Sequence, residues 1–102
     1  MAITVQDNPT DAAYELFDGD QLIGLAQYKQ AGQQIAFTHT EVAEAYGGQG
    51  LGHRLVKAAL DDARAHNWQV LPYCPFVAKF ISTNPSYIDL VPAGRRAAFG
   101  LA

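Results

Sequence analysis

The 102-residue chain is 49% hydrophobic and 17% charged, which is enough apolar material for a buried core and too little charge for a disordered chain. This length favours one domain over residues 1–102. The formal net charge of -3 argues against a general nucleic-acid binder, because such a protein needs a basic patch to neutralise phosphates.

The sequence also lacks the usual signals of membrane, secreted and metal-binding proteins. No apolar run approaches the roughly 20 residues needed to cross a bilayer, and the first eight residues do not resemble a signal peptide. We therefore expect a cytoplasmic protein without a membrane partner. Cys74 is the only cysteine, which excludes an internal disulfide and a zinc site built from several cysteines. The three histidines do not predict a metal site.

The first part of the chain alternates apolar and polar residues and predicts an antiparallel meander. The four predicted strands are Ile3–Asp7, Ala13–Asp18, Gln21–Lys29 and Gln34–Val42. The segments Asp18-Gly19-Asp20 and Ala31-Gly32-Gln33 lie between strands and are typical of tight turns, because Gly and Asp tolerate positive φ.

The fourth predicted strand carries polar side chains towards its end. Strict alternation predicts that one face carries Ile35, Phe37, His39 and Glu41, while the even-numbered residues share the other. His39 or Glu41 could accept a proton from an incoming amine, directly or through water. A solvated strand end is the simpler interpretation of both residues.

After the strands, apolar residues over 51–63 recur at helical spacing and predict an amphipathic helix of about four turns. The segment Trp68–Tyr73 is typical of a short buried strand that stops at the prolines around it. A second helix is expected over Phe76–Thr83, ending before Pro85 because a residue before proline avoids helical geometry. Residues 87–102 give only a weak structural signal.

A glycine-rich segment, Gly47-Gly48-Gln49-Gly50-Leu51-Gly52, lies between a predicted strand and a predicted helix. The first turn of a helix has unpaired N–H groups and the positive end of the dipole, so it can bind an anion such as pyrophosphate. His53 or Arg54 could assist. The spacing matches neither a P-loop nor the dinucleotide fingerprint. From these residues alone, a connecting turn without a ligand stays open.

The longer string TEVAEAYGGQGLGHRLV, residues 40–56, resembles the acetyl-CoA signature of the GNAT superfamily of N-acyltransferases. Together with LPYCPFV at 71–77 and NPSY at 84–87, it resembles a small single-domain GNAT-like subfamily over nearly the whole chain. The resemblance implies an α+β fold. In it, a twisted, mostly antiparallel sheet splays open after the fourth strand and packs with two main helices.

The resemblance also implies that the chain binds acetyl-CoA. The pantetheine arm would insert between the fourth and fifth strands, with backbone hydrogen bonds from Val42. The residues implied at the pyrophosphate are Gly47, Gly48, Gln49, Gly50, Leu51 and Gly52, with His53 at the border. Phe76 and Tyr87 are further candidates for cofactor contact. The superfamily pattern has Arg or Gln at the position of Gly47, which leaves the affinity open.

The resemblance places the acetyl thioester at the end of the fifth predicted strand, where Cys74 lies. Cys74 could accept the acetyl group, protonate the leaving thiolate or only pack as a small apolar side chain. Many larger GNAT enzymes place a tyrosine near the position of Ile81-Ser82, and none stands there. We expect a monomeric or homodimeric enzyme that acetylates an amine of a small molecule or protein. The alternative is a noncatalytic acyl-CoA-binding sensor or interaction module.

Overall fold

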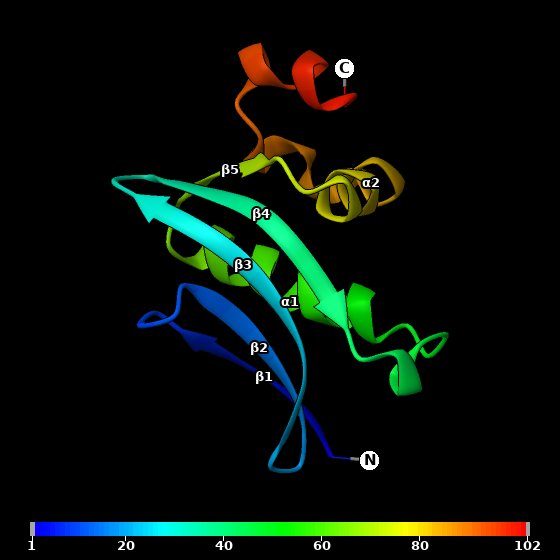
Figure 1. Cartoon of the computed structure of the whole chain (residues 1–102). Helices are drawn as coiled ribbons and strands as arrows, with labels where there is room; N and C mark the ends of the chain where they lie inside the picture. Colours follow the sequence, from blue (N-terminus) through cyan, green and yellow to red (C-terminus); the bar gives the residue numbers. More distant parts are fainter. Residues whose placement is uncertain (1, 102) are drawn as a thin grey trace.

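The structure is a computed structural model that describes residues 2–101 (Figure 1). Its strands are β1 (Ile3–Asn8), β2 (Ala13–Asp18), β3 (Gln21–Ala31), β4 (Gln34–Val42) and β5 (Gln69–Pro72). The helices are α1 (Leu51–Ala65) and α2 (Pro75–Thr83). The 3-10 turns are η1 (Glu44–Tyr46), η2 (Pro85–Leu90), η3 (Ala93–Arg95) and η4 (Ala97–Phe99). Within residues 2–101, no helix has both the length and the hydrophobicity to cross a membrane.

The five strands form one sheet in chain order, with every neighbouring pair antiparallel except β4 and β5. That pair is parallel because α1 connects the two strands as a crossover. The ladder between β4 and β5 covers only 34–37 and 69–72, so the strands separate after Phe37. The predicted α+β fold, with a sheet that splays after the fourth strand, is confirmed.

The core lies between the sheet and the two helices. Figure 1 shows α1 behind the strands and α2 beside β5. The buried side chains of α1 are Leu51, Leu55, Val56, Ala59, Leu60 and Ala63. They meet the inward side chains of the sheet, among them Leu16, Ile35 and Phe37. No helix of the described chain covers the other face of β1–β4, called the outer face below, which is why Thr4, Gln6 and Gln27 on that face are exposed.

A β-bulge interrupts the pairing of β3 with β4. Gln27 pairs with His39, whereas the next residue of β3, Tyr28, pairs with Phe37. Thr38 is therefore an extra residue in β4. Such an insertion reverses the alternation of side chains beyond it.

The bulge turns the end of β4 over. Thr40 lies opposite Ala26, which is fully buried, so Thr40 belongs to the face that carries the helices. His39 and Glu41 lie on the outer face and are exposed. The prediction that both share a face with Ile35 was therefore wrong, because strict alternation holds only for an unbroken ladder.

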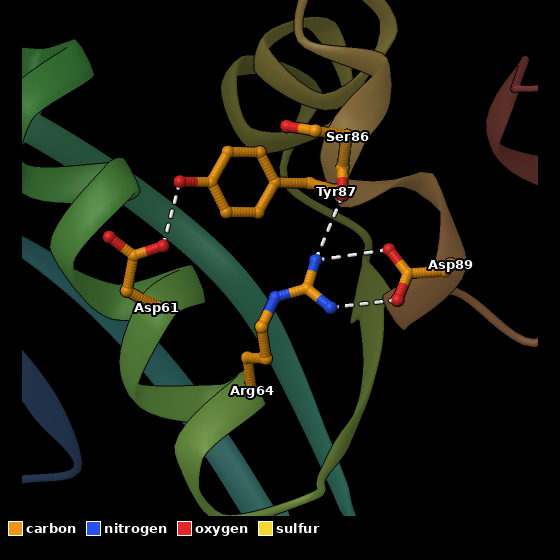
Figure 2. Close-up of polar contacts among 5 residues, drawn as sticks. All are labelled: Asp61, Arg64, Ser86, Tyr87 and Asp89. Carbon is orange, nitrogen blue, oxygen red and sulfur yellow. Dashed lines mark hydrogen bonds and ion pairs between the residues drawn. The ribbon is translucent and has the colours of Figure 1, made fainter.

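The segment with the weakest sequence signal docks on α1 through polar contacts (Figure 2). Arg64 donates to both carboxylate oxygens of Asp89, at 2.8 and 3.0 Å, and to the carbonyl of Ser86 at 2.9 Å. The Tyr87 hydroxyl donates to Asp61 at 2.7 Å. Contacts of this kind leave no hydrophobic period in the sequence, so η2 was not predicted.

Candidate functional site

A groove with a cavity volume of about 500 Å3 lies where β4 leaves β5 and α1 begins. It is lined by the end of β4, the glycine-rich loop, the first turn of α1 and the start of α2. The lining residues are Thr40, Glu41, Val42, Tyr46, Gly47, Gly48, Gly50, Leu51, Gly52, His53 and Phe76. Most of the predicted site residues therefore meet in one place. His39, Gln49, Cys74 and Tyr87 do not line this groove.

The loop presents its backbone amides without partners. Gly48 and Gly50 have φ values of 76° and 72°, in the left-handed region that favours glycine. Within residues 2–101, no amide from Gly48 to His53 donates to a protein acceptor. The next amide, that of Arg54, starts the helical ladder by donating to the carbonyl of Gly50 at 3.1 Å. The N-terminus of α1 therefore points free donors at the groove.

Phe76 faces the loop from the start of α2. A Cβ at Gly52 would lie 2.8 Å from the Cζ of Phe76. Because Gly52 has no side chain, the Phe76 ring can pack against the first turn of α1. His53 packs against two phenyl rings, with centroid distances of 5.7 Å to Phe76 and 5.6 Å to Phe80. Phe76 is 39% exposed, which leaves part of its ring open to a ligand.

Tyr46 lines the groove although the sequence did not single it out as a site residue. Its hydroxyl donates to Asp18 at 2.8 Å, which connects η1 to the turn between β2 and β3. This hydrogen bond raises the pKa of Tyr46 and lowers the pKa of Asp18, because it favours the phenol and the carboxylate. In the sequence, only the position of Tyr46 directly before the glycine-rich segment could have indicated that it belongs to the site.

Cys74 reaches the groove through Thr40. The cysteine is 4% exposed, and its thiol donates to the Thr40 hydroxyl at 3.4 Å. The Cys74 amide donates to the carbonyl of Phe37 at 2.9 Å, at the point where β4 and β5 part. A buried thiol and a hydroxyl on the groove wall thus lie together inside the opening of the sheet. Thr40, like Tyr46, was not predicted as a site residue.

Glu41 borders both faces of the sheet. It lines the groove and also a second hollow of about 370 Å3 on the outer face, with Leu22 and Leu25. His39 lies 2.9 Å from the Glu41 carboxylate, and the two side chains are 54% and 61% exposed. The structure therefore brings together the two residues predicted as candidate bases, next to the groove and open to solvent.

The two cations in the N-terminal half of α1 are already engaged. Arg54 donates to the carbonyl of Ile3 at 3.2 Å, and Lys57 donates to Asp61 at 2.9 Å. Among residues 2–101, no group of three or more His, Cys, Asp or Glu side chains could hold a metal ion. The groove therefore offers mainly backbone amides to an anion.

Comparison with known proteins agrees with this geometry. Residues 13–90 match the family described as GCN5-related N-acetyl-transferase, and this range covers most of the chain. The chain belongs to this family. The matched range contains β2 to β5, α1, α2, the opening between β4 and β5 and the glycine-rich loop at the start of α1.

Two relatives of this GNAT chain are Protein NATD1 of Bos taurus and of Homo sapiens. The bovine protein is 41% identical over 64 residues, covering 57% of this chain and 52% of that protein. The human protein is 36% identical over 59 residues, covering 57% and 52%. The chain therefore spans about half the length of these relatives.

A solved structure shows the same GNAT fold. The NMR solution structure of a GCN5-like protein from Staphylococcus aureus matches with a TM-score of 0.69 over 89% of each chain. The sequence identity is 24%, so this likeness bears on the fold alone.

Proposed function

We propose that this member of the GNAT family binds acetyl-CoA in the groove and transfers the acetyl group to an amine. The observation that carries the proposal is the run of unpaired amides from Gly48 to His53 at the start of α1. A pyrophosphate suits these donors, which lie at the positive end of the helix dipole. Gly47 lacks the side chain of the superfamily pattern, but the amides that follow it are all present.

The opening between β4 and β5 suits an extended pantetheine arm. In the described chain, β4 has no β5 partner beyond Phe37, so its last residues can bond an inserted ligand as a sheet bonds an added strand. Val42 and Thr40 lie along this path. Bound acetyl-CoA supplies the activated acetyl group, and an arm on this path would end beside Thr40 and Cys74.

The side chains at this point can carry the two proton transfers that acetylation needs. Glu41, held by His39, can take the proton of an amine that arrives from the outer face. Thr40 accepts a hydrogen bond from the Cys74 thiol, so it can give its hydroxyl proton to the leaving sulfur while it takes the thiol proton of Cys74, and the Cys74 thiolate then regains a proton from solvent. The amine and the thioester would then approach from opposite faces of the sheet. The open hollow by Leu22 fits an amine of a small molecule or of a protein.

Thermal melting with acetyl-CoA tests the binding. At a concentration of 100 to 1,000 times the dissociation constant, a ligand of the folded state adds about 2.7 to 4.1 kcal/mol to the free energy of unfolding. We expect a rise in melting temperature of several degrees or more. Release of free CoA in the presence of a panel of amines then tests the transfer. An unchanged melting temperature at saturating acetyl-CoA would contradict the proposal.

A noncatalytic acyl-CoA sensor is the second candidate function, and two observations favour it. The helix α2 contains no tyrosine, and the Cys74 thiol is buried rather than open to the groove. A sensor would show the same melting shift but release no CoA with any amine. A third route is transfer of the acetyl group through Cys74. Measurement of the intact mass after incubation with acetyl-CoA tests this route, because it would leave an acetyl group on Cys74.

Replacing Tyr87 with phenylalanine should lower stability without changing the affinity for acetyl-CoA. Its hydroxyl donates to Asp61 and its ring packs on Phe80 at a centroid distance of 5.7 Å, away from the groove lining. Loss of this hydrogen bond, whose acceptor is half exposed, should cost about 1 kcal/mol in the free energy of unfolding. Urea unfolding and a binding titration measure the two effects. A weaker affinity would instead support the predicted contact of Tyr87 with the cofactor.

A further inference from the structure

Another pocket, distinct from the groove and from the hollow beside Leu22, lies at the other end of α1. It has a cavity volume of about 260 Å3 and is built from β1, the turn after it, β3 and the residue before β5. Its lining residues are Asp7, Pro9, Ala12, Tyr28, Gln30 and Trp68. The helix has 15 residues and is therefore about 20 Å long, so this pocket is separate from the groove at its N-terminus.

Aromatic rings form part of the pocket and its support. Trp68 and Tyr28 belong to the lining. His66, at the C-terminal end of α1, stacks on Trp68 with a centroid distance of 4.2 Å and an angle of 11° between the ring planes. Tyr14 packs on Tyr28 at 5.2 Å. The indole is thus held in a fixed orientation at the pocket wall.

One carboxylate, that of Asp7, lines the pocket, and no lysine or arginine is among its lining residues. The Tyr28 hydroxyl donates to Asp7 at 2.7 Å, and the hydroxyl of Tyr14 donates to Asp62 on α1. Burial and then the hydrogen bond to Asp7 raise the pKa of Tyr28 well above its usual value, so the tyrosine stays neutral beside the carboxylate. In the described part of the chain, Asp7 forms no ion pair, whereas the Nδ1 of His66 lies 3.5 Å from the carboxylate of Asp62.

The turn at the rim has an unusual backbone. Ala12 has a φ of 52°, in the left-handed region that alanine rarely adopts. Its amide donates to the carbonyl of Pro9 at 3.2 Å, and its carbonyl accepts from the amide of Tyr28 at 2.9 Å. Conformations of this kind persist where the surrounding structure imposes them, and they concentrate at binding sites.

We infer that this pocket binds an organic cation of the quaternary or methylated ammonium class. A trimethylammonium group combines a positive charge, which the Asp7 carboxylate and the electron-rich ring of Trp68 attract, with methyl groups that suit the apolar side chains of Pro9 and Ala12. A primary ammonium is more strongly hydrated and fits such a wall less well. This inference does not depend on acetyl-CoA binding or on acetyl transfer.

The fluorescence of Trp68 provides a direct test, because it is the only tryptophan of the chain. Choline and Nε-trimethyllysine are titrated into the protein without acetyl-CoA, with 3,3-dimethylbutanol as the uncharged analogue of choline. We expect a saturable change with both cations and at least about tenfold weaker binding of the alcohol. A change that rises linearly without saturation, or an equal response to choline and the alcohol, would overturn the inference.

A pair of charge variants locates the site. Asp7→Asn removes the charge but keeps an oxygen that can accept from Tyr28, and it should weaken choline binding about tenfold. Asp11→Asn removes a carboxylate outside the pocket lining, which is bonded to Asn8, and should leave the binding unchanged. Equal binding by both variants would overturn the inference. If Asp7→Asn proves unfolded by melting, the comparison of choline with the alcohol on the unmodified chain decides.

Discussion

Replacing Gly48 with valine should weaken acetyl-CoA binding by about tenfold or more, which corresponds to about 1.4 kcal/mol. Gly48 has a φ of 76°, and its amide begins the run of unpaired donors that the proposed pyrophosphate would meet. A β-branched residue disfavours this backbone conformation and adds a side chain at the wall of the groove. Isothermal titration with acetyl-CoA measures the loss.

Gly32 offers a matched control at the other end of the molecule. Its φ is 57°, and at both glycines an added Cβ would meet no atom within 4 Å. Gly32→Val and Gly48→Val should therefore both lower the free energy of unfolding by about 1–2 kcal/mol, because they place the same strain on the backbone. Gly32→Val should leave the affinity for acetyl-CoA unchanged. Equal affinities of the two variants would show that the loop amides do not hold the ligand.

The fold could be predicted largely because its signals are local. The turn residues around Gly19 and Gly32 and the apolar period of α1 each lie within a few residues of the structure that they determine. The bulge at Thr38 is different, since nothing in the alternation of β4 marks it. It follows from how β4 pairs with β3, where Ala26 must face the core opposite Thr40. This contact between strands decided the orientation of the candidate base Glu41.

The candidate site likewise contains residues with local sequence signals and residues that are placed by distant contacts. The glycine-rich loop and the helix after it are continuous in sequence, so their residues were predicted as a group. Thr40 gains its place in the site from Cys74, 34 residues away, and Tyr46 gains its place from Asp18. The cofactor contact of Tyr87 stays a prediction, and its hydrogen bond to Asp61 on α1 was not visible in the sequence. Such partners are set by tertiary packing, which a single sequence does not display.

Changing Glu41 to glutamine should lower kcat for amine acetylation by about a hundredfold or more, the usual scale of a lost general base. The substitution keeps the size of the side chain and removes its capacity to take a proton. Because the loop and the opening between β4 and β5 are untouched, the KM for acetyl-CoA should stay the same. His39→Gln should have a smaller effect, since His39 acts only through its contact of 2.9 Å with Glu41.

Glu15 is the matched control for this experiment. It lies in the same cross-strand row, because Leu25 pairs with Glu15 on one side and with Glu41 on the other. Both carboxylates therefore belong to the outer face, but Glu15 is two strands away from the groove. Glu15→Gln should leave kcat unchanged. If both variants lose activity equally, a general negative charge on this face steers the amine, and if neither loses activity, the base is another group.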